Sequence, residues 1–168
     1  SEEAYTDSSQ IDANYEDRYY VIQNTRSKKY IYNTSNGYLE QTKLEDVSPY
    51  RCMWELIKRD EGGYYIQNKL TENYIGYPGS NETSIVSKDE AASFLFSTLN
   101  HSNGGIKMQA IKGENKTYLN DKGNGGKVIC GYSTENDPGS GFNFYEATLE
   151  TKPAAFNDNV VLETIAST

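Results

Sequence analysis

Few side chains in this sequence are typical of catalysis. The chain has one histidine, His101, and it lacks the sequence motifs of serine hydrolases, phosphate-binding loops, zinc proteases and dinucleotide sites. Ser/His/Asp catalysis would rest on His101 alone, which we interpret as a solvated turn residue. A glycosidase needs two positioned carboxylates, and Asp121 and Asp137 are candidates only because an acidic chain has many such residues. We therefore expect neither catalysis nor a cofactor.

The cysteines do not predict a metal site either. Cys52 and Cys130 lie 78 residues apart and match no metal-ligand spacing. A disulfide is one reading, but we favour two buried free thiols. Residues 12–16 begin like a calcium loop, yet the glycine expected at the sixth position is missing. We expect no bound metal.

Composition excludes several other classes. The chain has 168 residues, a formal net charge of −8 and a pI near 4.7. This balance argues against a nucleic-acid binder and against a polybasic membrane-surface protein. Mean hydropathy is −0.78, and no apolar run approaches the roughly 18 residues of a membrane span. Yet 15 Tyr, 5 Phe and 1 Trp indicate a folded domain.

The elements that position the polar residues come from an internal repeat. Residues 20–24 (YVIQN) recur as 64–68 (YYIQN) and more weakly as 106–110 (IKMQA). A second step recurs at Tyr30, Tyr74 and Tyr118, each 44 residues after the last. Each unit ends on an apolar-x-aromatic step, and these steps are 52–54, 94–96 and 142–144. Three features in the same order, three times, define three units of about 43 residues.

Within each unit the hydrophobic period is two, which predicts short strands separated by Gly, Asn and Pro turns. Four strands per unit would also suit a propeller blade, but propellers usually need at least four blades. Twelve strands in three units predict an all-β, β-trefoil fold: a six-stranded barrel capped by three hairpins. Pseudo-threefold symmetry would then relate Ile22, Ile66 and Met108. We expect the core at these and similar positions, namely Ile31, Trp54, Leu56, Ile75, Phe94, Phe96, Leu119, Phe142 and Phe144.

The repeats also set the predicted domain boundaries. The trefoil would occupy residues 19–150, with repeats at about 19–61, 62–104 and 105–150. Residues 1–18 form an acidic polar arm or linker, and 151–168 a C-terminal extension with one possible extra strand. The first residue is Ser, so we expect a processed chain or a piece of a longer protein.

At these residues the chain resembles the ricin-type β-trefoil lectin family, a class of carbohydrate-binding modules whose repeats close on Gln-x-Trp. The resemblance covers about 130 residues and includes the Tyr-x-Ile-x-Asn opening of a repeat and the later Lys-Tyr-Ile step. The closing Gln is replaced by Cys52, Phe94 and Phe142, and only Trp54 keeps the Trp. The divergent repeats are similar to trefoil modules attached to secreted bacterial glycan-degrading enzymes.

The resemblance implies where a sugar would bind. In that family an Asp follows the second strand of a repeat, and an aromatic platform lies about twelve residues before the closing aromatic. An aromatic ring covers the apolar face of a pyranose, while carboxylates and amides match its hydroxyls. The third repeat fits this plan best. Its predicted site is Asn120, Asp121, Tyr132, Asn136 and Asp137.

The other repeats match less well. The first offers Tyr32, Asn33 and Tyr38, but Thr42 stands at the platform position. The second has Gly76 and Tyr77 after its second strand, with Ser84 at the platform position.

We therefore predict a non-catalytic, lectin-like carbohydrate-binding module that binds a mono- or oligosaccharide and neither nucleic acid nor a membrane. We expect it to be an accessory domain of a larger secreted or cell-surface, glycan-degrading protein, joined to the rest of a multidomain chain. Two alternatives stay open: a trefoil protein-interaction or inhibitor domain, and a structural spacer whose sugar pockets have decayed.

Overall fold

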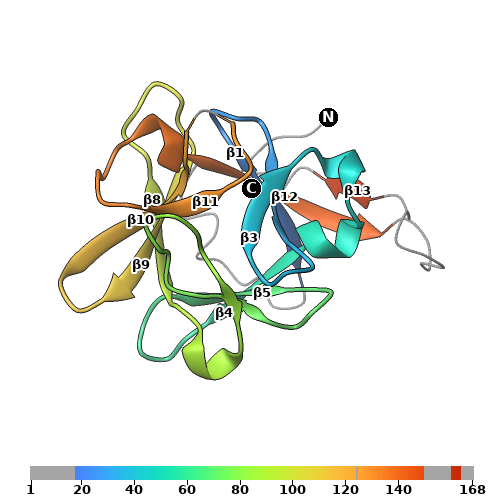
Figure 1. Ribbon diagram of the computed structural model, residues 1–168, viewed down its shortest axis with the longest axis horizontal. Coiled ribbons are helices and arrows are strands. Elements are labelled where there is room, and N and C mark those ends of the chain that lie inside the picture. The colour runs from blue at the N-terminus through green and yellow to red at the C-terminus, as the bar shows by residue number, and fades with distance from the viewer. Residues whose placement is uncertain (1–17, 124, 150–159, 164–168) are drawn as a thin grey trace.

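The computed structural model describes residues 18–123, 125–149 and 160–163 (Figure 1). These residues form thirteen antiparallel strands in one continuous sheet, with four short 3-10 helices and no α-helix. The strands of the first repeat are β1 (Tyr19–Asn24), β2 (Tyr30–Asn33), β3 (Leu39–Thr42) and β4 (Trp54–Lys58). The second repeat has β5 (Tyr64–Asn68), β6 (Tyr74–Ile75), β7 (Ile85–Val86) and β8 (Phe94–Thr98). The third has β9 (Ile106–Lys112), β10 (Asn115–Asp121), β11 (Ile129–Tyr132) and β12 (Phe142–Leu149).

Six of these strands close into a barrel. β1 pairs with β4, β4 with β5, β5 with β8, β8 with β9, β9 with β12, and β12 returns to β1. Closure of the ring leaves these six strands without an open sheet edge. The remaining pairs, β2–β3, β6–β7 and β10–β11, are hairpins that extend from the barrel.

The three hairpins also bond to one another. Leu39 N donates to Thr83 O at 2.8 Å, Gln41 N to Lys127 O at 2.8 Å, and Gly131 N to Gly79 O at 2.6 Å. Each hairpin therefore contacts both others and together they form a cap. A six-stranded barrel with a three-hairpin cap is a β-trefoil, which confirms the predicted fold class.

The core follows the predicted threefold symmetry. Ile22, Ile66 and Met108 are fully buried at equivalent positions of β1, β5 and β9. Their partners across the barrel sheet are Phe144, Leu56 and Phe96. The predicted core residues all belong to one hydrophobic cluster, with Phe96 only partly buried at its margin.

The structure corrects the prediction of which aromatic residue closes each repeat. The strand register pairs Tyr20 with Trp54, Tyr64 with Phe94, and Ile106 with Phe142. Trp54 is therefore equivalent to Phe94 and Phe142, not to Phe96 and Phe144 as predicted. The residues two positions before these closing aromatics are then Cys52, Ala92 and Ser140. The sequence misled because each of the last two closing strands carries aromatics two residues apart, and both face the core.

Most of both chain ends lies outside the described residues. The predicted arm at 1–18 falls there except for Arg18, and so does most of 151–168. Within that C-terminal part, β13 (Val160–Glu163) pairs with β12 outside the barrel. The predicted domain boundaries stay predictions. No described helix is long and apolar enough to cross a membrane.

Candidate functional site

A pocket of about 490 Å³ lies where the third repeat meets the first, and we call it the third-repeat pocket. Strands β10 and β11 supply one wall, and the β1–β2 loop supplies another. The lining residues are Arg26, Ser80, Asn120, Lys122, Gly123, Cys130, Gly131, Tyr132 and Asp137. The sequence prediction named three of them: Asn120, Tyr132 and Asp137.

Tyr132 supplies the aromatic surface of this pocket. It is the last residue of β11, and its side chain is 46% exposed. The hairpin register pairs Tyr132 with Tyr118, as it pairs Thr42 with Tyr30 and Val86 with Tyr74. Tyr132 is therefore equivalent to Thr42 of the first repeat, while the second-repeat counterpart is Val86 rather than the predicted Ser84. An exposed ring above a polar pocket is suited to the apolar face of a sugar.

Asn120 and Asp137 form the polar side of the pocket. The Asn120 Nδ2 donates to Asp137 Oδ2 and to Ser140 Oγ, both at 2.9 Å. Asp137 Oδ2 also accepts from Gly139 N at 2.9 Å, which caps the 3-10 helix η4 (Pro138–Ser140). Within the described residues no hydrogen bond uses Asn120 Oδ1 or Asp137 Oδ1. These two oxygens are acceptors of fixed orientation that suit hydroxyl donors.

Asp121 does not fit its predicted role as a sugar ligand. Its side chain is fully buried and forms an ion pair with Arg26, whose Nε lies 3.2 Å from Oδ2. The same guanidinium donates to the Asp121 carbonyl at 2.8 Å, and Gly125 N donates to Oδ1 at 3.3 Å. A carboxylate with these partners and no exposed surface cannot receive hydroxyls. Asp121 instead holds Arg26 at the pocket wall.

Asn136 also lies away from the pocket. Its Oδ1 accepts from Asn100 N at 2.9 Å and from Lys107 Nζ at 3.0 Å. Lys107 is bonded to Glu135 as well, at 2.9 Å, and this bond lowers the pKa of the Glu135 carboxyl. The predicted contact of Asn136 with sugar is therefore replaced by a structural role on the neighbouring surface.

Sequence reasoning missed Arg26, Lys122 and Ser140. Arg26 is 95 residues from Asp121 in the chain, so no local pattern could connect them. One signal was available for the loop that carries Arg26. Asn24 ends the repeat motif, and its Oδ1 accepts from the backbone N of Arg26 and Ser27 at 3.0 and 2.9 Å.

Gly139 lies close to two residues that line the third-repeat pocket. A Cβ at this position would collide with the Arg26 guanidinium and lie 3.0 Å from Asn120 Nδ2. Only a residue without a side chain lets Arg26 and Asn120 approach each other here.

A second pocket, of about 420 Å³, is lined by the first repeat and by Lys127 of the third, and we call it the first-repeat pocket. Its lining residues are Tyr32, Thr34, Ser35, Asn36, Glu40, Val47, Ser48, Arg51 and Lys127. Burial, and then the Glu40 carboxylate, raise the pKa of the Tyr32 phenol. Of the three residues predicted for this repeat, only Tyr32 lines the pocket.

The other two are placed elsewhere. Asn33 is buried, and it donates to Thr34 O at 2.9 Å and accepts from Thr71 Oγ1 at 2.7 Å. Tyr38 is 36% exposed and forms a β-bridge with Ser84 of the second repeat. Asn33 therefore joins two repeats, and Tyr38 belongs to the contact between two hairpins.

The two pockets are equivalent by strand register. The cross-strand pair Tyr32–Glu40 of the first repeat corresponds to Asn120–Cys130 of the third. Cys130 and Cys52 are both buried, free thiols, which confirms the prediction for the cysteines. Burial raises the pKa of both thiols, and that of Cys52 rises to about 12. Within the described residues no cluster of His, Cys, Asp and Glu is suited to hold a metal ion.

No protein-family model matches this chain, and no curated protein matches its sequence. Solved structures do match. A ricin B-like lectin from Macrolepiota procera, solved with lactose, aligns with a TM-score of 0.65 and 11% identity over 78% of this chain and 96% of its own. The C-half of an earthworm R-type lectin, solved with GalNAc, aligns with a TM-score of 0.54 and 15% identity over 77% of this chain and 98% of its own. ThreeFoil, a designed threefold-symmetric protein, aligns with a TM-score of 0.59 and 12% identity over 75% of this chain and 96% of its own. At these identities the matches establish the fold: this chain has the β-trefoil architecture of ricin B-like lectins.

Proposed function

We propose that this domain is a non-catalytic carbohydrate-binding module whose principal site is the third-repeat pocket. One observation carries the proposal. The exposed Tyr132 ring lies in the same pocket as two fixed carbonyl-type acceptors, on Asn120 and Asp137. The lactose and GalNAc complexes of structurally similar lectins support the ligand class.

The geometry suggests how a sugar would bind. Tyr132 would cover the apolar face of one ring, and Asp137 Oδ1 and Asn120 Oδ1 would accept from its hydroxyls. Neutral hydrogen bonds contribute only about 0.5–1.5 kcal/mol each. We therefore expect a Kd on the order of 0.1–1 mM, about −4 to −5.5 kcal/mol.

The wider context is also a proposal. Weak single sites gain strength when several act together, as in a module attached to an enzyme that acts on the same polymer. We propose an extracytoplasmic accessory domain of a larger glycan-degrading protein, supported by the sequence resemblance alone.

Tyr132→Ala tests the site directly. The variant should lose about fivefold or more in affinity for a saccharide identified on a glycan array, because one stacking ring is worth on the order of 1 kcal/mol or more. Its melting temperature should change little, since the ring is exposed. Thr42→Ala, at the equivalent position of the first repeat, is the matched control and should bind like the parent chain.

Two outcomes would contradict the proposal. If Tyr132→Ala unfolds the domain, the ring belongs to the core and not to a platform. If a broad array finds no saccharide, the protein-interaction, inhibitor or spacer alternatives take precedence, and a panel of proteases becomes the next test.

A further inference from the structure

The acidic net charge of the chain does not come from residues 18–149, which include the whole trefoil. Residues 1–17 contain six Asp and Glu and no Lys or Arg. Between residues 18 and 149 the sequence has 15 basic and 15 acidic residues, so this region carries no formal net charge. A neutral domain with an uneven distribution of charge can carry a strongly basic surface that the whole-chain value hides.

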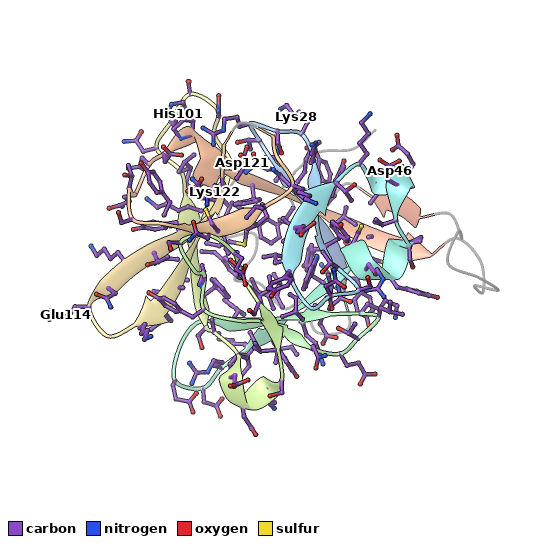
Figure 2. All side chains as sticks on the ribbon, viewed as in Figure 1. Lys28, Asp46, His101, Glu114, Asp121 and Lys122 are labelled. Atoms are coloured by element: carbon purple, nitrogen blue, oxygen red, sulfur yellow. The ribbon has the colours of Figure 1, made fainter. Side chains whose placement is uncertain are left out.

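Such a surface lies on two neighbouring loops. The β1–β2 loop holds Arg26, Lys28 and Lys29, and the β10–β11 loop holds Lys122 and Lys127; we call these five residues the basic ridge. Figure 2 shows Lys28, Asp121 and Lys122 on the same side of the molecule. Lys28, Lys122 and Lys127 are exposed.

Specific bonds hold the two loops together. Lys29 Nζ of the β1–β2 loop donates to Gly125 O of the β10–β11 loop, and Arg26 forms an ion pair with the buried Asp121. Gln41 links them again, because its Nε2 donates to Gly126 O at 2.6 Å while its Oε1 accepts from Ser27 Oγ at 2.7 Å. The cations are thus brought together by the fold.

The basic ridge contributes cations to both pockets. Arg26 and Lys122 line the third-repeat pocket, and Lys127 lines the first-repeat pocket together with Arg51. Each pocket also has one tyrosine, Tyr132 or Tyr32, and one carboxylate, Asp137 or Glu40. The cations therefore outnumber the carboxylates in each pocket and on the ridge.

We infer that the preferred ligand is an anionic saccharide that carries carboxylate or sulfate groups and extends across the basic ridge from one pocket toward the other. This inference rests on the proposed function. Its sugar rings would contact the tyrosines, and its anionic groups would lie over Lys28, Lys122 and Lys127. Exposed cations attract such groups over a Debye length of about 10 Å at 0.1 M salt, whereas a neutral glycan gains nothing from them.

The test uses the full chain and three probes of matched length: oligogalacturonate, heparin oligosaccharide and a neutral galactan oligosaccharide. The ridge variant is Lys28→Gln with Lys122→Gln and Lys127→Gln. The control variant removes three exposed lysines on other elements, Lys58→Gln, Lys88→Gln and Lys116→Gln. Both variants change the net charge equally, so only the position of the lost cations differs.

We expect at least one anionic probe to bind about tenfold more tightly than the neutral one at low salt, as for electrostatically assisted binding. The ridge variant should lose most of that difference and the control variant less than about twofold. Raising salt from 50 to 300 mM should weaken anionic binding several-fold and leave neutral binding unchanged. Because heparin carries carboxylates as well as sulfates, tighter binding of oligogalacturonate would identify the carboxylate, and tighter binding of heparin would show that sulfate contributes.

Three results would overturn the inference. Equal binding of neutral and anionic probes, unchanged in the ridge variant, would reject it while leaving the proposed function intact. Failure of all saccharides would reject both. Binding of a duplex DNA of equal charge as tightly as the best glycan, unaffected by Tyr132→Ala, would show a general polyanion surface instead of a glycan site.

Discussion

The first-repeat and third-repeat pockets lie at equivalent junctions of the trefoil, but different chemistry closes each junction. Behind the third-repeat pocket, the buried Asp121 forms an ion pair with Arg26 of the next repeat in the cycle. At the equivalent place behind the first-repeat pocket, Asn33 accepts a hydrogen bond from Thr71 at 2.7 Å. One backbone arrangement therefore holds a charged pair at one junction between repeats and a neutral pair at the other.

The remaining junction shows a third solution. There Tyr77 occupies the place of Asn33 and Asp121, and its hydroxyl donates to Thr117 Oγ1 at 3.1 Å. The Lys112 ammonium lies 4.9 Å from the centre of the Tyr77 ring. The comparison teaches that the trefoil fixes which residues meet between repeats, while the residue types decide what each junction can bind.

The largest effects should follow loss of the two asparagines that organise the junction loops. Asn24 donates to Gly139 O and Asn68 donates to Arg51 O, both at 2.9 Å, and each also accepts from two backbone N–H groups. Asn24→Ala and Asn68→Ala should each cost about 3 kcal/mol in urea denaturation, because several buried groups lose partners together. Only Asn24→Ala should impair the third-repeat pocket.

The exposed Asn115, in the β9–β10 hairpin, supplies the control, and Asn115→Ala should change stability by less than about 0.5 kcal/mol. If Asn68→Ala abolishes binding at the third-repeat pocket while the protein stays folded, the two pockets are not independent.

A smaller difference should separate the two junction pairs themselves. Asp121→Ala should destabilise the fold by about 2 kcal/mol. This is less than the loss expected on breaking a wholly buried ion pair, because the Arg26 side chain is 26% exposed and can regain water. Asn33→Ala removes neutral hydrogen bonds and should cost about 1 kcal/mol. Chemical denaturation of both variants measures the difference; equal losses would show that the ion pair adds nothing over the amide.

The two thiols offer a comparison of accessibility. Cys130 lines the third-repeat pocket, whereas Cys52 is fully buried beneath the first repeat. Burial raises both pKa values, so both groups are mainly protonated thiols at pH 8, and their reaction rates should rise with pH as thiolate forms. With an aromatic disulfide reagent at pH 8, Cys130 should react at least about tenfold faster than Cys52. The single variants Cys52→Ala and Cys130→Ala assign the two phases, and faster reaction of Cys52 would contradict the description of the two pockets.

The smallest expected effect is a gain in saccharide affinity. Thr42→Tyr places a ring in the first repeat at the position that Tyr132 occupies in the third. Affinity at the first-repeat pocket should rise about two- to threefold, well short of a full stacking contribution because the remaining pocket differs. Titration in a Tyr132→Ala background isolates this pocket. No gain there would show that the platform works only with the polar groups of the third repeat.

Much of the fold was predictable because its signals are local or periodic. The strand period and the turn residues are read within a few residues of each other, and Tyr30, Tyr74 and Tyr118 recur at a constant spacing of 44 residues. Tyr132 was also predictable, since a hairpin position depends on short separations along the chain. The closing aromatics were shifted by two residues, because a strand with aromatics at both Phe94 and Phe96 satisfies the same period in either alignment.

The trefoil, its symmetric core and the repeat with an exposed tyrosine could be predicted from the amino-acid sequence, since these depend on periodicity and local spacing. The chemistry of the pockets instead arises from contacts between distant parts of the chain. The tertiary structure buried Asp121 against Arg26 from the opposite end of the chain, turned Asn136 toward Lys107, and brought five cations together in a chain of net negative charge. These outcomes depend on closure of the barrel, which places loops about 95 residues apart in contact, and pairwise contacts at that separation leave no periodic trace in the sequence.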